Sequence, residues 1–129
     1  MRADELEVKQ LTPDDLEIIK HFMAWCHKKL HVHPPYPRVE ISYDKALTQQ
    51  LHRTGSYEHV SNVMTVYAGN RNLVDVLRTI AHELQHKRQG EQGRIHQKSP
   101  PGSKLEREAD AQAGYLMKLY GAEHPEIFK

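Results

Sequence analysis

The chain has 129 residues, enough for one domain with its own hydrophobic core but not for two ordinary cores, so we expect a single domain over residues 1–129. Its 18 basic and 17 acidic side chains give a formal net charge of +1, which excludes the strongly basic surface typical of proteins that bind nucleic acid or anionic membranes. No apolar stretch approaches the roughly 20 residues of a membrane-spanning helix, and the polar first residues do not resemble a signal peptide, so we expect a soluble, cytoplasmic protein.

The first predicted helix follows Thr12. This residue precedes a proline and two aspartates, the pattern of a helix N-cap, and apolar residues then recur at helical spacing as far as Leu30. The helix is expected to end before the proline-rich segment 33–37, so we interpret the His-Val-His triplet at 31–33 as a helix-terminating loop. Cys26, the only cysteine, lies on the apolar side of this helix and is expected in the core.

Two strands are expected next. Residues 38–43 alternate between polar and apolar side chains, which is the period of a half-buried strand. A short helix or turn over residues 44–52 is expected to follow and to close near Gly55. Residues 60–68 are rich in β-branched and aromatic side chains and are followed by a Gly-Asn pair, which predicts a second strand.

Two long helices are predicted in the second half of the chain. Asn72, with an aspartate three residues on, opens a helix that carries one apolar stripe and ends near Gly90. Residues 93–102 contain two adjacent prolines and predict a loop. Ser103 can cap the last helix, which we expect to end at Gly121. The order of all these elements predicts an α+β domain in which a short β-sheet packs on helices.

Ten histidines in a chain of this length justify a search for metal ligands. Two candidate ligands are the histidines of the segment His82-Glu83-Leu84-Gln85-His86. On a helix, residues four apart lie about 40° apart in projection and about 6 Å apart along the axis. The two imidazoles therefore project from one face and can share an ion. The alternative is a polar helix face with solvated histidines.

Glu83 is the candidate catalytic residue. It follows the first histidine of the pair and points to the side of the metal, where it could reach a water molecule bound there. Zinc lowers the pKa of such a water from about 16 to about 7, and a neighbouring carboxylate can accept its proton as it attacks a carbonyl group. A proton held by Glu83 could then pass to the leaving amine.

A catalytic zinc site typically has three protein ligands, and the last helix offers the third. Glu106 and Asp110 stand four residues apart on one face, so Glu106 can bind the metal while Asp110 accepts a hydrogen bond from the far ring nitrogen of a ligand histidine. Three alternatives stay open. Glu106 could instead cap its own helix in a capping box with Ser103, while Glu108 or the loop residue His96 could supply the third ligand.

These two motifs resemble those of the gluzincin metallopeptidases, in which H-E-x-x-H on one helix is joined by E-x-x-x-D on a later helix. The form E-x-x-A-D at residues 106–110 is similar to that of compact intracellular groups such as the ImmA/IrrE-like peptidases. The resemblance covers residues 60–120. It implies a small zincin-like domain whose metal lies between the H-E-x-x-H helix and the C-terminal helix. By that resemblance the zinc ligands are His82, His86 and Glu106, the general base is Glu83, and Asp110 is the partner of His82.

The chain also departs from related patterns. Lys87 and Arg88 stand where these peptidases usually have uncharged residues, and Gln112-Ala113 stands where a Phe-Ala pair is usual. The metzincin pattern fails, because it requires a glycine and a histidine at positions that are Gln89 and Gln92 here.

Two further features stay undecided at this level. No spacing selects the residue that stabilises the transition state, and the candidates are Arg94, His96, Tyr115, Tyr120 and His124. The polar tail 122–129 could cover the cleft in a latent form.

The predicted activity is that of a zinc-dependent endopeptidase acting on proteins or peptides, with no nucleic-acid or membrane partner. The strand at 60–68 could be the sheet edge that binds an extended substrate through main-chain hydrogen bonds. Two other functions stay possible: a zinc amidase on a cell-wall or small-molecule substrate, and a non-catalytic regulatory domain with a zinc site. The substrate, subfamily and oligomeric state are not determined by the sequence.

Overall fold

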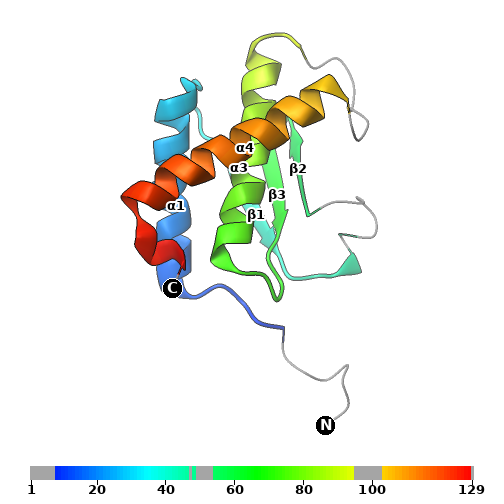
Figure 1. Cartoon of the computed structure of the whole chain (residues 1–129). Helices are drawn as coiled ribbons and strands as arrows, with labels where there is room; N and C mark the ends of the chain where they lie inside the picture. Colours follow the sequence, from blue (N-terminus) through cyan, green and yellow to red (C-terminus); the bar gives the residue numbers. More distant parts are fainter. Residues whose placement is uncertain (1–7, 47, 49–53, 95–102, 129) are drawn as a thin grey trace.

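The structure is a computed structural model that describes residues 8–46, 48, 54–94 and 103–128. Its elements are α1 (Pro13–Leu30), β1 (Arg38–Ser42), β2 (Gly55–Glu58), β3 (Val63–Tyr67), α3 (Leu73–Glu91), α4 (Lys104–Glu123) and the 3₁₀ helix η2 (Pro125–Phe128) (Figure 1). The three long helices and the small mixed sheet of the described residues make the fold α+β, as predicted. None of the described helices has both the length and the apolar composition needed to cross a membrane.

The sheet has the strand order β1-β3-β2, so the prediction that the second strand forms an edge is wrong. β3 lies in the centre, parallel to β1 on one side and antiparallel to β2 on the other. The edge next to α3 is β2, a strand that the sequence pattern missed. Its residues, Gly-Ser-Tyr-Glu, include only one strong β-former, and pairing with β3 makes them a strand.

The predicted start of the second strand at Val60 is also wrong, because residues 59–62 form a turn between β2 and β3. Val60 is 93% exposed. The Glu58 carboxylate accepts hydrogen bonds from the backbone N–H groups of Val60 and Ser61. Asn62 has a φ of 55°, in the left-handed region that asparagine tolerates. A hairpin turn therefore interrupts the β-branched run.

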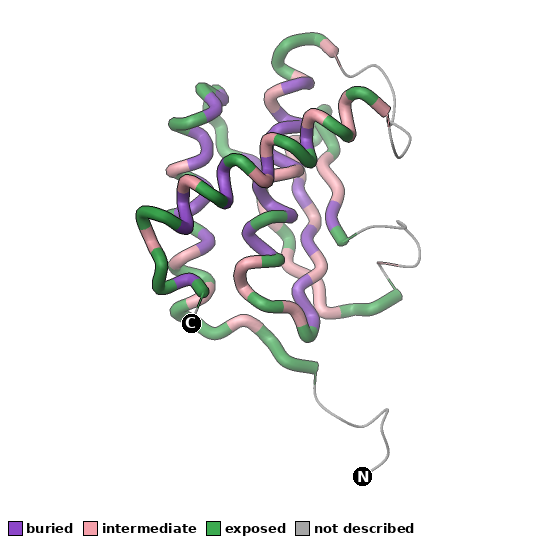
Figure 2. Tube along the Cα trace, viewed as in Figure 1, coloured by how far each residue is buried: buried purple, intermediate pink, exposed green. Residues whose placement is uncertain are grey.

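α3 is the central helix of the fold. It packs against α1, α4, β2 and β3, and α4 crosses it on the side away from the sheet (Figure 1). Leu77, Ile80 and Leu84 on its predicted apolar stripe are fully buried. The buried residues run along the inner sides of all these elements (Figure 2). Cys26 lies in this core, as predicted, and burial raises the pKa of its thiol.

The helix ends follow local chemistry, with one exception. Thr12 caps α1 in a capping box with Asp15, and α1 ends at Leu30 with His31 in the left-handed conformation. Ser103 caps α4 by accepting a hydrogen bond from the backbone N–H of Glu106. The exception is Gly121, which was expected to end α4 but lies within it.

The reason is that Gly121 provides space and not a helix stop. A Cβ atom at this position would lie 2.7 Å from the ring of Phe128, so the glycine allows η2 to pack against α4.

Asn72 begins α3 as predicted, although its side chain makes no capping hydrogen bond. Most of the predicted helix or turn at 44–52 and of the loop at 93–102 lies outside the described residues.

Lys87, a departure from the peptidase pattern, points away from the histidine motif. Its side chain is 6% exposed, and its Nζ donates hydrogen bonds to the His33 carbonyl oxygen at 3.1 Å and to Glu91 Oε2 at 2.6 Å. The other carboxylate oxygen of Glu91 accepts a bond from the His33 backbone N–H at 3.1 Å. This ion pair between the buried Lys87 and the more exposed Glu91 therefore joins the end of α3 to the segment that follows α1.

Replacing Leu84 by alanine tests whether α3 organises the core. We expect the free energy of unfolding to fall by about 2–5 kcal/mol, because a fully buried leucine leaves a cavity when it is truncated. Leu16 on α1 is 41% exposed, so Leu16→Ala is the matched control and should cost less than about 1 kcal/mol. Urea unfolding of metal-free protein measures both. Equal losses would mean that α3 is not the centre of the core.

Candidate metal centre

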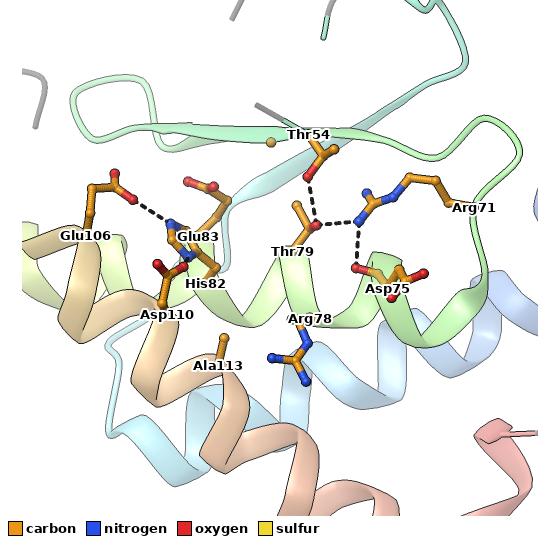
Figure 3. A pocket seen from close by; sticks show the side chains of 11 residues that line it. Thr54, Arg71, Asp75, Arg78, Thr79, His82, Glu83, Glu106, Asp110 and Ala113 are labelled. Carbon is orange, nitrogen blue, oxygen red and sulfur yellow. Dashed lines mark hydrogen bonds and ion pairs between the residues drawn. The ribbon is translucent and has the colours of Figure 1, made fainter. Parts of the chain in front are cut away.

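Three residues of α3 and α4 bring potential metal-ligand atoms together, and one atom from each residue can be chosen so that all three lie within 4.8 Å of one another. His82 Nε2 lies 3.0 Å from Glu106 Oε2 and 3.1 Å from His86 Nε2, and His86 Nε2 lies 3.1 Å from Glu106 Oε1. The side chains are 17%, 9% and 12% exposed for His82, His86 and Glu106. This group could hold a metal ion. Figure 3 shows Glu106 of α4 turned toward His82 of α3.

The far nitrogen of each imidazole is held by a hydrogen-bond acceptor. His82 Nδ1 lies 2.8 Å from Asp110 Oδ1, and His86 Nδ1 lies 2.7 Å from Gln89 Oε1. The orientation of the Gln89 amide is set by its other end, because Nε2 must donate its 3.0 Å bond to the Leu105 carbonyl oxygen. Both neutral imidazoles are therefore expected to carry their proton on Nδ1.

This tautomer leaves three electron pairs facing one another. With the protons on Nδ1, both Nε2 atoms present lone pairs, and the Glu106 carboxylate is also an acceptor. These acceptor groups, whose nearest atoms lie about 3 Å apart, repel one another unless a cation or a proton lies between them. Ligands at zinc bond lengths of about 2.05 Å in a tetrahedron stand roughly 3.4 Å apart, and one ligand atom from each of the three residues can be chosen with all three within 4.8 Å of one another. The residues present therefore fit a metal ion.

The environment of His86 favours its neutral form. Burial lowers the pKa of its imidazole, and the nearby His82 lowers it too, although Gln89 and Glu106 act in the opposite direction. A neutral imidazole is the form that binds a metal.

Glu83 lies beside this centre in a buried position. Its side chain comes from the turn of α3 between the two histidines, and the residue is 3% exposed. In Figure 3 it points from α3 toward β2. A Cβ atom built on Gly55, the first residue of β2, would lie 3.4 Å from Glu83 Oε2 and 2.5 Å from the side-chain methyl of Thr79. A glycine at this position therefore lets the edge strand approach the carboxylate.

A cavity of about 560 Å³ opens between β2, α3 and α4, and two of the three potential ligands, His82 and Glu106, line it (Figure 3). Its described lining residues are Thr54, Gly55, Arg71, Asp75, Arg78, Thr79, His82, Glu83, Glu106, Asp110 and Ala113. Glu83, Glu106 and Asp110 lie around His82, whereas Arg71, Asp75 and Arg78 come from the turns that precede it. The cavity thus has room for a substrate beside the metal ligands.

Of the alternative third ligands, Glu108 lies away from the histidines. Glu108 pairs through both carboxylate oxygens with Arg94, which lowers the pKa of the Glu108 carboxyl group. His96 lies outside the described residues. The Ser103 hydroxyl accepts a hydrogen bond from the backbone N–H of Glu106, as expected for a helix cap. The Glu106 carboxylate, however, lies beside the histidines.

None of the four described candidates for transition-state stabilisation lines the cavity. Arg94 is paired with Glu108. Tyr115 is 57% exposed, and the Tyr120 hydroxyl lies 2.7 Å from His21 Nδ1. His124 is paired with Glu126 near the end of the chain.

The tail is positioned away from the centre. In η2, Ile127 is buried and Phe128 lies against Gly121, and neither residue lines the cavity that holds the histidines. The described part of the tail therefore does not cover this cleft.

Several residues of the site were missed by the sequence pattern. Gln89 is three positions after His86, and Arg78 is four positions before His82, so helical spacing could have indicated both. Arg71 and Thr54 come from segments outside the helices, and no local signal places them here.

Searches of protein-family models, curated proteins and solved structures found no match to this chain.

Removing the acceptor of either imidazole should weaken metal binding. We expect Asp110→Ala and Gln89→Leu each to lower the affinity for zinc by about 10–100-fold, because the ring then loses the bond that sets its tautomer and direction. Competition with a chelating dye measures the affinity. Gln92→Leu is the matched control, since Gln92 is an exposed glutamine at the C-cap of the same helix. An unchanged affinity in both variants would contradict this assignment of the tautomers.

Adding one methyl group at Gly55 should separate β2 from α3. In Gly55→Ala the new Cβ would meet the Thr79 side chain at 2.5 Å and the Thr65 carbonyl oxygen at 3.3 Å. We expect a loss of about 1–3 kcal/mol in the free energy of unfolding from overpacking. Thermal and urea unfolding measure it. Gly93→Ala is the control. Its added Cβ would meet no other atom, but the residue has a φ of 72°, so the change in its unfolding free energy measures backbone strain alone.

Proposed function

We propose that this protein is a zinc-dependent metallopeptidase of the gluzincin type. The observation that carries the proposal is the convergence of two imidazole lone pairs and one carboxylate beside a second, buried carboxylate in an open cavity. A set of two histidines and one glutamate is a known ligand set of catalytic zinc, with the remaining position left for water. The motif resemblance further supports a zincin-like domain in the cytoplasm.

Zinc suits these ligands better than a hard cation does. Imidazole nitrogen favours zinc and other late transition metals, whereas calcium and magnesium prefer six or more oxygen ligands. The cluster offers two nitrogens and a single carboxylate. When bound, zinc would lower the pKa of a water molecule and polarise the carbonyl group of the substrate.

Glu83 is the proposed general base. It lines the same cavity as His82 and Glu106, and it lies on the turn of α3 that joins His82 to His86. It accepts the proton of the attacking water and returns that proton to the nitrogen of the leaving amine, so the carboxylate is regenerated after each cycle. Burial shields this carboxylate from bulk water.

The substrate chain is proposed to lie along β2. No described strand pairs with the outer edge of β2, and this edge begins at Gly55 in the cavity wall. Unpaired main-chain groups of an edge strand can bind an extended peptide by hydrogen bonds with little dependence on side chains. The proposed substrate-binding edge is therefore β2, and not the strand at 60–68 that was first expected to bind the substrate.

Metal analysis combined with a proteolysis assay tests the proposal. We expect about one zinc ion per chain after reconstitution, lost in His82→Ala and Glu106→Ala because each removes a ligand. Glu108→Ala is the control, since that carboxylate is paired with Arg94, and it should retain zinc. With an unstructured protein as substrate, Glu83→Gln should bind zinc but cleave at least about 100-fold more slowly.

The outcomes separate the rival functions. No zinc after reconstitution would overturn the proposal. Bound zinc without turnover of any amide would indicate a non-catalytic zinc domain. Cleavage of a cell-wall amide but not of the unstructured protein would indicate an amidase.

A further inference from the structure

The part of the cavity lined by residues 71–78, which precede the metal ligands in the chain, carries two positive charges and one negative charge and is called the basic end. Arg71 and Arg78 line it together with Asp75. The other charged side chains of the lining are Glu83, Glu106 and Asp110, which lie around His82 (Figure 3). The lining therefore has acidic groups around the metal position, and two arginines with one aspartate from the preceding turns.

The two arginines are held differently. Arg71 Nη1 donates to the Tyr67 carbonyl oxygen at 2.7 Å, and its Nη2 donates to the Asp75 carbonyl oxygen and to Thr79 Oγ1, both at 2.9 Å. Thr79 Oγ1 lies 3.2 Å from Thr54 Oγ1 (Figure 3). These bonds use three of the five guanidinium N–H groups and fix the position of Arg71 as a positive charge in the wall.

Arg78 has its guanidinium available for a ligand. It is exposed and forms no ion pair with any residue that the structure describes. Its Nη1 lies 3.8 Å from the position of a Cβ on Gly114, so the small residues Ala113 and Gly114 of α4 leave space around it. Figure 3 shows this side chain extending from α3 beside Ala113.

The position of Arg78 relative to the metal ligands determines which substrate residue it can contact. Arg78 precedes His82 by one turn of α3, a separation of about 6 Å along the helix axis. An extended peptide advances about 3.3 Å per residue. A group that contacts Arg78 therefore belongs to a substrate residue within about two positions of the scissile bond.

Resting on the function proposed above, we infer that this end of the cavity is a subsite for an acidic group, and that Arg78 selects substrates with a carboxylate close to the scissile bond. Guanidinium binds carboxylate through charge-assisted hydrogen bonds. Arg71 adds a second positive charge from the wall, offset by Asp75. The carboxylate can be an Asp or Glu side chain or the C-terminus of a short peptide.

Peptides that differ at one position test this subsite. Fluorogenic peptides cleaved by the wild type would carry Asp, Asn or Lys at each of the two positions on either side of the scissile bond. We expect kcat/KM for Asp to exceed that for Asn by roughly tenfold at one position. Arg78→Gln should remove this preference, and Arg78→Glu should reverse it in favour of Lys, a change that general damage to the fold cannot produce.

A matched control variant and peptides that carry a second kind of carboxylate are also tested. Arg38→Gln removes an exposed arginine at the opposite edge of the sheet and should leave the preference unchanged. Short peptides with a free C-terminus are compared with their amides. A preference for the free carboxylate that is lost in Arg78→Gln identifies the terminus as the source, whereas a preference confined to Asp identifies the side chain.

Binding without turnover separates this inference from the proposed activity. Peptide hydroxamates with Asp, Asn or Lys at the selected position are titrated into the zinc-loaded Glu83→Gln protein, with and without Arg78→Glu. Tighter binding of the Asp peptide that reverses with Arg78→Glu supports the subsite even if no substrate is cleaved. Cleavage or binding that is indifferent to the charge, or a preference that survives Arg78→Glu, overturns it and leaves the proposed peptidase activity standing.

Discussion

The organising constraint of this molecule is the approach of two imidazoles and one carboxylate, whose nearest atoms lie about 3 Å apart between two helices. In the neutral tautomers that Asp110 and Gln89 favour, the ring protons lie on the outer sides and none lies between the inner nitrogens. A cation at this point would convert repulsion into attraction and cross-link α3 to α4. The bond from Gln89 to the Leu105 carbonyl oxygen joins the same two helices without a metal.

α3 connects this centre to the rest of the cavity. Its apolar side forms the middle of the core, and its polar side presents Arg78, His82 and Glu83 to the cavity. The Thr54, Thr79 and Arg71 contacts link β2, α3 and the segment before α3. The edge strand, the proposed base and the basic end are therefore positioned by a single well-packed helix, which is an arrangement that keeps reacting groups in register.

The accuracy of the sequence predictions followed the range of the interactions involved. α1 was predicted from Thr12 to Leu30 because its cap and its apolar spacing are local features. β2 was missed because pairing with β3, and not its own composition, makes it a strand. Gly121 was assigned as a helix stop because a contact with Phe128 cannot be read from nearby residues.

The sequence by itself determined the three helices, the α+β class and the pairs at helical spacing, namely His82 with His86 and Glu106 with Asp110. Helical periodicity sets which residues share a face, and that property needs no tertiary contact. Only the tertiary structure decided that Glu106 and not Glu108 meets the histidines, that Gln89 orients His86, and that two arginines line the same cavity as His82. These relations depend on how α4 crosses α3 and how β2 lies against it, and such packing is a property of the whole chain.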